Sequence, residues 1–386
     1  MAEVMQESMK SAVIERYSTA AGQREDLLCC PVDYDPRYLE IIPQEVIERD
    51  YGCGDPSKYV NKGETVLDLG SGGGKICFIA SQVVGAEGRV IGIDMNDDML
   101  ALARNSKAAV AEKAGFDNVT FFKGKIEDLA LDRGKLEEYL EKYPIKNGQD
   151  LQRFENYTSE LRASSPMIKD NSIDVIVSNC VLNLVDEVDK PAMFKELYRV
   201  LKKGGRVAIS DIISDEEVPV EMKKDPNLWS GCISGAFQEQ QFIKMFEDNG
   251  FYAITLEKRD EKPWQVVNGI EFRSVTVVAY KGKEGDCWDH KEALVYKGPF
   301  KEVTDDDGHT FRRGERTAVC RKTFEIFQQP VYNDFFYGIE PLEAVKPGDA
   351  LAFPCNAGRL TRSPKETKGE DYSITEMNAC GPGDCC

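Results

Sequence analysis

Histidines, CxxC pairs and long apolar runs are scarce or absent in this sequence of 386 residues. The two histidines, His290 and His309, lie late in the chain, which argues against histidine-based acid–base or metal chemistry in the first 289 residues. No apolar run of about 18 residues occurs, so no membrane span is expected. The N-terminal segment carries acidic residues and lacks the apolar stretch of a signal peptide. A cytoplasmic, reducing location is therefore expected.

Basic residues are outnumbered in this chain. There are 49 Lys and Arg residues against 67 Asp and Glu residues, which gives a formal net charge of −18. Such a surface repels nucleic acid and anionic membranes, and it tolerates a neutral or cationic ligand. We therefore expect no nucleic-acid partner and no membrane partner. Nothing in the sequence requires an oligomer, and we expect a monomer.

Cysteine is the abundant exception. The absence of any CxxC pair argues against a zinc knuckle or a thioredoxin-type motif. In a reducing compartment, many thiols favour metal, metalloid or redox chemistry over a disulfide framework. Any single cysteine can equally be a small buried hydrophobic residue, as we expect for Cys77. The 12 cysteines are at positions 29, 30, 53, 77, 180, 232, 287, 320, 355, 380, 385 and 386.

Short apolar segments alternate with segments of helical periodicity from Thr65 onward. This alternation predicts βαβ units, and hence an α/β fold with a parallel sheet and flanking helices. After about residue 283 the pattern changes to short strands with turn signals. We predict four parts: an N-terminal helical cover (1–63), an α/β domain (64–282) with a polar helical insertion (about 132–170), a small mainly β domain (283–365), and a flexible Cys-rich tail (366–386).

A cofactor site is indicated by "VLDLGSGGGK", residues 66–75, where glycines follow a short strand. Glycines let a ligand approach the backbone closely. The next predicted strand, "VIGIDM", ends with Asp94, and an acid at this place accepts both hydroxyls of a ribose. Two cofactor classes fit this pattern. A dinucleotide site normally has the spacing GxGxxG, whereas the spacing here is GxGxG.

The GxGxG spacing, with Asp68 inside the preceding strand, resembles the class I S-adenosylmethionine-dependent methyltransferases. The resemblance implies a Rossmann-like sheet and S-adenosylmethionine as the cofactor. It also implies that "GKIEDL" lies near the adenine, with Ile126 and Glu127 as contacts. A nicotinamide-binding domain is the alternative. The expected cofactor residues are Asp68, Gly70, Ser71, Gly72, Gly74, Asp94, Met95, Ile126, Glu127 and Asn179.

Three cysteines are placed near this site by the predicted topology. Cys180, in "VSNCVLNLV", follows a strand at the carboxyl edge of the sheet, where doubly wound folds bind ligands. Cys232, in "LWSGCISGAF", follows the next strand, and Cys53, in "DYGCGDP", precedes the cofactor strand. Local sequence leaves open whether Cys180 fills the core or contacts a ligand. The topology favours the ligand.

The motifs "YGCG", "VLDLGSGGG", "VIGIDM", "VSNCVLNLV" and "LW-x-GC-x-x-GA" occur here in one order. Together they resemble the arsenite S-adenosylmethionine methyltransferase family over about residues 10–280. The resemblance implies four functional thiols: Cys53, Cys180, Cys232 and one member of the pair Cys29 and Cys30. From this pair we choose Cys30. It also implies arsenite or its thiol conjugates as substrate, and a thiol reductant (thioredoxin or glutathione) as co-substrate.

The thiol chemistry suits trivalent arsenic, which is soft and binds three thiolates. We expect Cys180 and Cys232 to be arsenic ligands, with Cys53 as a third ligand or as a disulfide partner. Two alternatives remain: a methyltransferase for another soft acceptor (selenium, antimony, tellurium or a small thiol), and a non-catalytic metalloid-binding protein. The tail "CGPGDCC" either delivers or pre-binds arsenic or is dispensable.

Overall fold

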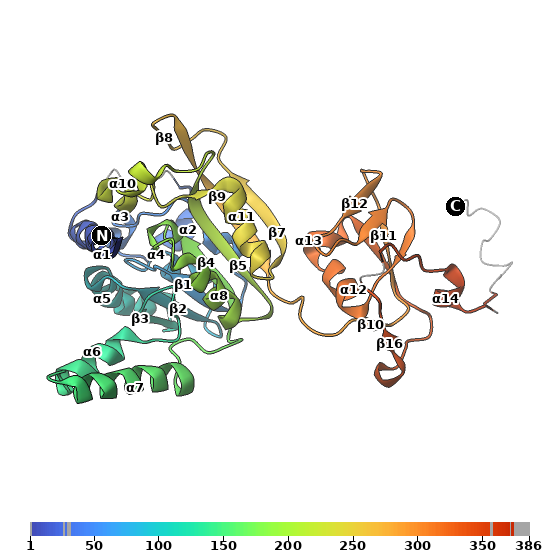
Figure 1. The fold of residues 1–386 in the computed structure, drawn as a ribbon, viewed down its shortest axis with the longest axis horizontal. Helices are drawn as coiled ribbons and strands as arrows, with labels where there is room; N and C mark the ends of the chain where they lie inside the picture. Colours follow the sequence, from blue (N-terminus) through green and yellow to red (C-terminus); the bar gives the residue numbers. More distant parts are fainter. Residues whose placement is uncertain (1, 26–27, 29–31, 356–357, 371, 374–386) are drawn as a thin grey trace. The chain divides into compact units, whose positions relative to one another are not determined.

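The computed structural model describes residues 2–25, 28, 32–355, 358–370 and 372–373. The chain divides into two compact units, residues 1–282 and residues 283–386 (Figure 1). Among the described residues, no helix is both long and apolar enough to cross a membrane.

The first unit is built on one central sheet with the strand order β3-β2-β1-β4-β5-β9-β7. The five strands β1 to β5 pair in parallel, whereas β9 pairs antiparallel with both β5 and β7. The predicted α/β fold is confirmed, although its sheet is mixed and not wholly parallel. The strands are β1 (Thr65–Leu69), β2 (Arg89–Asp94), β3 (Val119–Lys123), β4 (Ile173–Asn179), β5 (Leu201–Ser214), β6 (Phe237–Gln238), β7 (Tyr252–Arg259), β8 (Gln265–Val267) and β9 (Ile270–Tyr280).

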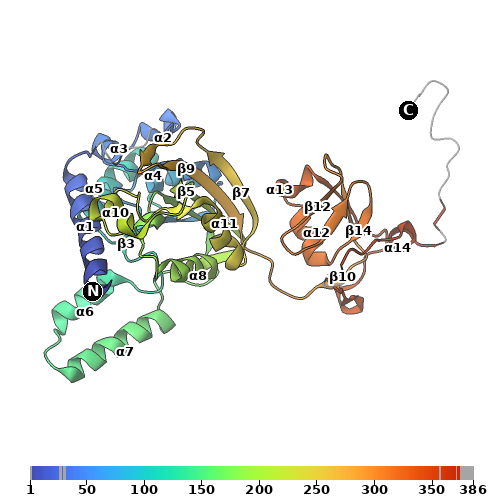
Figure 2. The same cartoon turned by 45° about the horizontal axis from the view of Figure 1, so that its top comes forward.

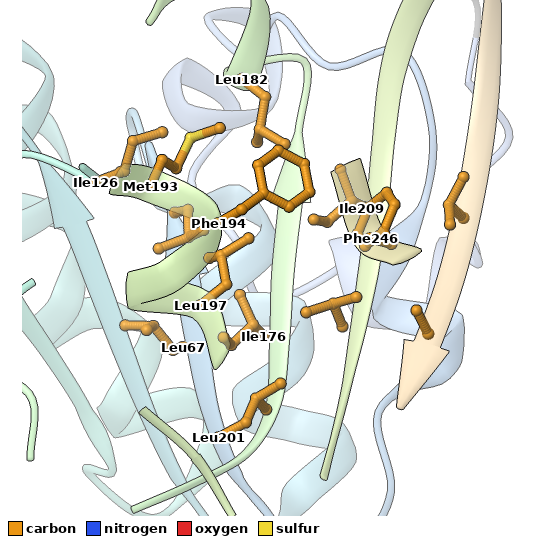
Figure 3. Close-up of a cluster of buried hydrophobic side chains, with 14 of the residues drawn as sticks. Leu67, Ile126, Ile176, Leu182, Met193, Phe194, Leu197, Leu201, Ile209 and Phe246 are labelled. Atoms are coloured by element: carbon orange, nitrogen blue, oxygen red, sulfur yellow. The ribbon is translucent and has the colours of Figure 1, made fainter. Parts of the chain in front are cut away.

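Helices cover both faces of this sheet (Figures 1 and 2). Helices α8 and α11 pack with Leu67 and the neighbouring strands on one face, as the buried side chains in Figure 3 show. Helices α4 and α5 pack with Val66 on the other face. Successive residues of β1 thus serve opposite cores, as the pleat of a strand requires. These helices are α4 (Lys75–Val84), α5 (Asp97–Ala114), α8 (Lys190–Val200) and α11 (Glu239–Asp248).

Local sequence explains where several helices begin and end. Asn96 caps the start of α5 by accepting hydrogen bonds from the backbone N–H groups of Asp98 and Met99, and Gly115 ends the helix with φ 82°. The segment "KPAMFKELYRVLKKGG" predicts a helix that its two glycines stop, and this prediction is wrong about the end of α8. That helix ends at Val200, and the glycines belong to β5, which begins at Leu201.

The remaining helical segments of the first unit lie at its N-terminus, in the insertion and in the loops after β4 and β5. The insertion forms two helices, α6 (Arg133–Lys142) and α7 (Gly148–Ser164). The others are α1 (Ala2–Gly22), α2 (Pro36–Leu39), α3 (Gln44–Glu48), η2 (Pro56–Tyr59), η3 (Leu182–Leu184), α9 (Val220–Lys223) and α10 (Pro226–Ser230).

The second unit contains small antiparallel sheets packed with short helices, in keeping with the predicted β character. Helix α14 includes the first residues of the predicted tail, and in this helix Thr367 is buried and accepts a hydrogen bond from Arg316. Residue 371 and the residues from 374 onward lie outside the described residues. The elements are β10 (Trp288–Asp289), β11 (Ala293–Tyr296), β12 (Glu302–Thr304), β13 (Thr310–Arg312), β14 (Arg316–Ala318), α12 (Arg321–Phe327), α13 (Pro330–Asn333), β15 (Phe336–Ile339), η4 (Pro347–Asp349), β16 (Leu351–Ala352) and α14 (Pro364–Lys368).

Candidate functional site

A cleft opens at the carboxyl ends of β1, β2 and β4, where ligands bind in this class of sheet. Nine of the ten predicted cofactor residues line it. The exception is Gly74, which begins α4 with φ 90°. A Cβ atom at Gly74 would lie 2.9 Å from Phe121, so this glycine allows the helix to pack closely on the sheet. The lining residues are Asp68, Gly70, Ser71, Gly72, Asp94, Met95, Ile126, Glu127 and Asn179, together with Cys180.

The glycine turn gives this cleft a backbone floor. Gly70 and Gly72 have φ values of 63° and 50°, a region that favours glycine. The Gly72 N–H donates to Asp94 Oδ2 at 2.8 Å, which fixes the turn against the end of β2. The hydroxyl of Ser71 is buried and has no hydrogen-bond partner among the described residues. A buried polar group of this kind is satisfied when a polar ligand fills the cleft.

Two carboxylates differ in their surroundings within the cleft. Burial raises the pKa of Asp94, and hydrogen bonds from the backbone N–H groups of Asn96 and Gly72 oppose the rise. Burial also raises the pKa of Asp68, to about 8. The thiol of Cys77 donates to Asp68 Oδ2 at 3.2 Å, and Cys77 is fully buried in the core, as predicted. A positive charge near Asp68 would therefore stabilise the ionised form of this carboxyl group.

Cys180 lines the cofactor cleft and also belongs to a group of three buried thiols. Cys53, Cys180 and Cys232 share one buried cluster. The neighbouring thiols of Cys232 and Cys53, followed by burial, raise the pKa of Cys180 well above its ordinary value. The thiol of Cys232 also donates to the Cys180 carbonyl oxygen at 3.4 Å. The fourth predicted thiol, Cys30, and its neighbour Cys29 lie outside the described residues.

Both Cys180 and Cys232 have a left-handed backbone, with φ values of 65° and 60°. Non-glycine residues seldom adopt this conformation, and it concentrates at functional sites. The surrounding loop is held firmly at Cys180, whose N–H donates to the Ser210 carbonyl oxygen at 2.8 Å. Both residues belong to the same buried cluster.

Asn179 has a structural role that the sequence did not reveal. Its Oδ1 accepts from the N–H groups of Cys53 at 2.8 Å and Gly54 at 3.0 Å, and its Nδ2 donates to the Gly54 carbonyl oxygen at 2.8 Å. The Ser274 hydroxyl donates to the Cys53 carbonyl oxygen at 2.7 Å. The Asn179 side chain therefore holds the turn that contains Cys53 close to Cys180, the next residue in the chain. Its predicted contact with the cofactor stays a prediction.

Replacing Gly52 with alanine is expected to displace Cys53. A Cβ atom at this position would lie 1.9 Å from Asn179 Nδ2, so the turn has to move away from Asn179. We expect the activity of the site to fall by about 10-fold or more, since a misplacement of about 1 Å can cost about 100-fold. Gly148→Ala is the matched control, because nothing lies within 4 Å of a Cβ atom there. Equal turnover of the two variants would contradict a role for this turn.

Tyr17 is a site residue that sequence reasoning missed. Its hydroxyl lies 3.8 Å from Cys232 Sγ, and it reaches the cleft from helix α1. Burial, followed by the charges of Cys232 and Cys180, raises the pKa of Tyr17. Nothing in the local sequence around Tyr17 distinguishes it from an ordinary helix residue.

Asp211 was missed as well. Its Oδ2 accepts from the Leu182 N–H at 2.9 Å, which fixes the loop that carries Cys180. Burial raises the pKa of Asp211 to about 6. An acid inside the apolar run "RVAISDII" was the available signal, because a buried strand rarely carries an unpaired charge.

Comparison with known proteins places this arrangement in a family. Residues 60–250 match a family model described as a methyltransferase domain. The chain is 31% identical over 347 residues to an arsenite methyltransferase of Aquipseudomonas alcaligenes, covering 85% of this chain and 90% of the relative. The chain belongs to the arsenite methyltransferase family. The human member is 29% identical over 371 residues, covering 90% of this chain and 86% of the relative.

A solved structure of the same family agrees with this assignment. The chain resembles the crystal structure of an arsenic(III) S-adenosylmethionine methyltransferase from Chlamydomonas reinhardtii with a TM-score of 0.55 and 27% identity. The match covers 82% of this chain and 99% of that protein. Residues 283–372 match a separate model, described as a domain of unknown function.

Proposed function

We propose that this chain transfers methyl groups from S-adenosylmethionine to thiolate-bound trivalent arsenic. The observation that carries the proposal is the position of Cys180. Cys180 packs with Cys53 and Cys232 in one buried cluster, and the same residue lines the cofactor cleft. A soft acceptor bound at these thiols therefore lies beside the cleft that holds the methyl donor. Membership of the arsenite methyltransferase family supports this acceptor.

The cleft fits S-adenosylmethionine, whose sulfonium supplies an electrophilic methyl group. Asp94 is suited to accept the two ribose hydroxyls, and Glu127 with Ile126 to contact the adenine. The free Ser71 hydroxyl and the glycine floor suit the amino-acid end of the cofactor. Asp68 is suited to a positive charge at that end, because a nearby cation offsets the cost of ionising a buried carboxyl group.

The thiols position the acceptor. Arsenite exchanges its hydroxyl groups for sulfur, and each exchange releases water, so thiols with raised pKa values react as they stand. Bound arsenic keeps a lone pair that attacks the methyl group in line: the As–C bond forms, the S–C bond of the sulfonium breaks, and S-adenosylhomocysteine leaves. Arsenic becomes pentavalent in this step, and the oxidation of two thiols to a disulfide supplies the two electrons that return it to the trivalent state. The attacking atom carries no proton, so no general base is needed. This explains why the site works without histidine.

Several finer features belong to the same proposal. Cys53 is the third arsenic ligand or the partner of Cys30 in a disulfide that re-reduces the product. Thioredoxin or glutathione then restores the thiols. We further propose that the protein acts as a monomer in the cytoplasm.

Binding of S-adenosylmethionine is expected to strengthen as the pH rises toward 8. The pKa of Asp68 is about 8, so this carboxyl group is mostly protonated in the free protein at neutral pH. A cationic ligand favours the carboxylate, and each pH unit below the pKa weakens binding by up to about tenfold. Calorimetry at pH 6, 7, 8 and 9 measures the affinity. Asp68→Asn should remove this dependence, and an unchanged pH profile in that variant would contradict the role of Asp68.

The proposed function is tested by product speciation. Purified protein, S-adenosylmethionine, a thiol reductant and arsenite are incubated, and the arsenic species are separated and identified. Methylated arsenic supports the proposal. If the cofactor binds but no methylated arsenic forms, the proposal fails, and parallel reactions with selenite and antimonite then test another soft acceptor. Arsenic binding without turnover of any acceptor would indicate a metalloid-binding protein.

A further inference from the structure

A second group of thiols lies in the C-terminal unit, far along the chain from the proposed active site. The sulfur atoms of Cys287, Cys320 and Cys355 all lie within 4.8 Å of one another. Within the part of the chain that the structure describes, this is the one group of three thiols with such mutual distances. All three cysteines are free.

The fold of this unit brings the three thiols together from three segments. Cys287 precedes β10 and Cys355 follows β16, and these two strands pair with each other. The Phe353 N–H donates to the Cys287 carbonyl oxygen at 2.8 Å, which holds the two segments side by side. Cys320 caps α12 and is fully buried, with its Sγ 3.3 Å from the Thr323 hydroxyl. The backbone therefore holds the three segments that carry these thiols close together.

The surroundings of the cluster favour a soft, thiophilic ligand. Ala318, Phe353 and Leu360 pack around the sulfurs, so competing hard ligands are few. Cys287 and Cys355 are half-buried, which leaves a path from solvent, whereas Cys320 closes the bottom. Burial acts to raise the pKa of Cys287, but hydrogen bonds from Cys355 and Cys320 and the charge of Lys322 lower it overall.

The number of donors distinguishes between soft ions. Structural zinc takes four protein ligands in a tetrahedron. The group here has three members among the described Cys, His, Asp and Glu residues, and the His309 ring instead contacts Asp305. Trivalent arsenic needs three thiolates and completes its shell with a lone pair. Because the three sulfur atoms already lie within 4.8 Å of one another, side-chain rotations can bring them onto one ion.

We propose that Cys287, Cys320 and Cys355 form a second binding site for trivalent arsenic, separate from the methylation site. The choice of arsenic as the ligand rests on the proposed function. Binding converts arsenous acid and three thiols into a tris-thiolate: three As–S bonds form, three As–O bonds break, and three water molecules leave. Arsenic stays trivalent, so no oxidant or reductant is required. The site holds the substrate on a unit that carries none of the proposed catalytic residues.

The first test uses the unmodified full chain. The reduced protein is treated with iodoacetamide with and without saturating sodium arsenite, and mass spectrometry measures the alkylation rate at each cysteine. We expect arsenite to slow alkylation of Cys287 and Cys355 by about tenfold or more. In Cys287→Ser, Cys355 should lose this protection, whereas in Cys77→Ser it should keep it. Unchanged rates at Cys287 and Cys355 would overturn the site.

A zinc arm tests the identity of the ion. Zinc sulfate replaces arsenite in the same protocol, and arsenite then competes with zinc. Protection by arsenite in the presence of equimolar zinc supports the assignment, whereas zinc protection that arsenite cannot displace overturns it. The readout is independent of turnover, so a protein that protects Cys355 but makes no methylated arsenic contradicts only the proposed function.

A coordination measurement completes the test. In a full chain whose cysteines 29, 30, 53, 180, 232, 380, 385 and 386 are serine, X-ray absorption should find three sulfur neighbours around bound arsenic. Adding Cys287→Ser should reduce this to two sulfurs and one oxygen. Circular dichroism verifies that each variant is folded. A folded background variant that binds no arsenic would contradict the proposal.

Discussion

Replacing Cys180 or Cys232 with serine is expected to abolish arsenite methylation and to leave S-adenosylmethionine affinity within about twofold. A serine hydroxyl is a hard donor and binds trivalent arsenic poorly, so the acceptor is lost from its place beside the cleft. Loss of this placement should lower turnover by about 100-fold or more, because a displacement of the reacting atoms by about 1 Å can already lower the rate by about 100-fold. Product speciation measures the turnover, and calorimetry measures the affinity for the cofactor.

Cys77→Ser is the matched control for these variants. Cys77 is also fully buried in the same unit, but its thiol donates to Asp68 and is not among the arsenic ligands. Serine keeps a donor for that hydrogen bond, so methylation should remain within a few-fold of the parent protein. Turnover retained in Cys180→Ser, or lost equally in Cys77→Ser, would contradict the assignment of the arsenic site.

The parts of the site that the sequence predicted are those set by chain order. The Gly70 turn directly follows β1, Asp94 ends β2, and Cys180 follows β4. In a parallel sheet the carboxyl ends of neighbouring strands lie at one edge, so these residues converge whatever the loops do. The reversed direction of β9 was less predictable, because an apolar run buried on both faces has the same pattern in either direction.

The parts that the sequence did not predict depend on contacts between distant segments. Asn179 contacts the Cys53 turn through hydrogen bonds that no local pattern specifies. Tyr17 reaches Cys232 only because α1 packs across the cleft, and Cys320 meets Cys287 only after β10 and β16 pair. Their spacing in the chain resembles no motif. The folded chain creates these neighbours, so they appear only in the structure.

Replacing Asp94 with alanine is expected to weaken S-adenosylmethionine binding by about 100-fold or more. Each hydrogen bond from a ribose hydroxyl to this carboxylate is worth about 1.5–3 kcal/mol, and two such bonds are lost. The carboxylate also accepts from the N–H groups of Gly72 and Asn96, both at 2.8 Å, so its removal loosens the glycine floor as well. Calorimetry measures the dissociation constant, and the KM for S-adenosylmethionine should rise in parallel.

Asp94→Asn separates the two contributions. The amide oxygen keeps one of the two acceptors for the Gly72 and Asn96 N–H groups, so the turn is kept in part while the charge is lost, and the affinity should fall between those of Asp94→Ala and the parent protein. Asp98→Ala is the control, since this acid is exposed in the first turn of α5 and does not line the cleft. Its affinity should match the parent. If Asp94→Ala binds S-adenosylmethionine as tightly as Asp98→Ala does, Asp94 does not hold the ribose, and the cofactor lies elsewhere along the cleft.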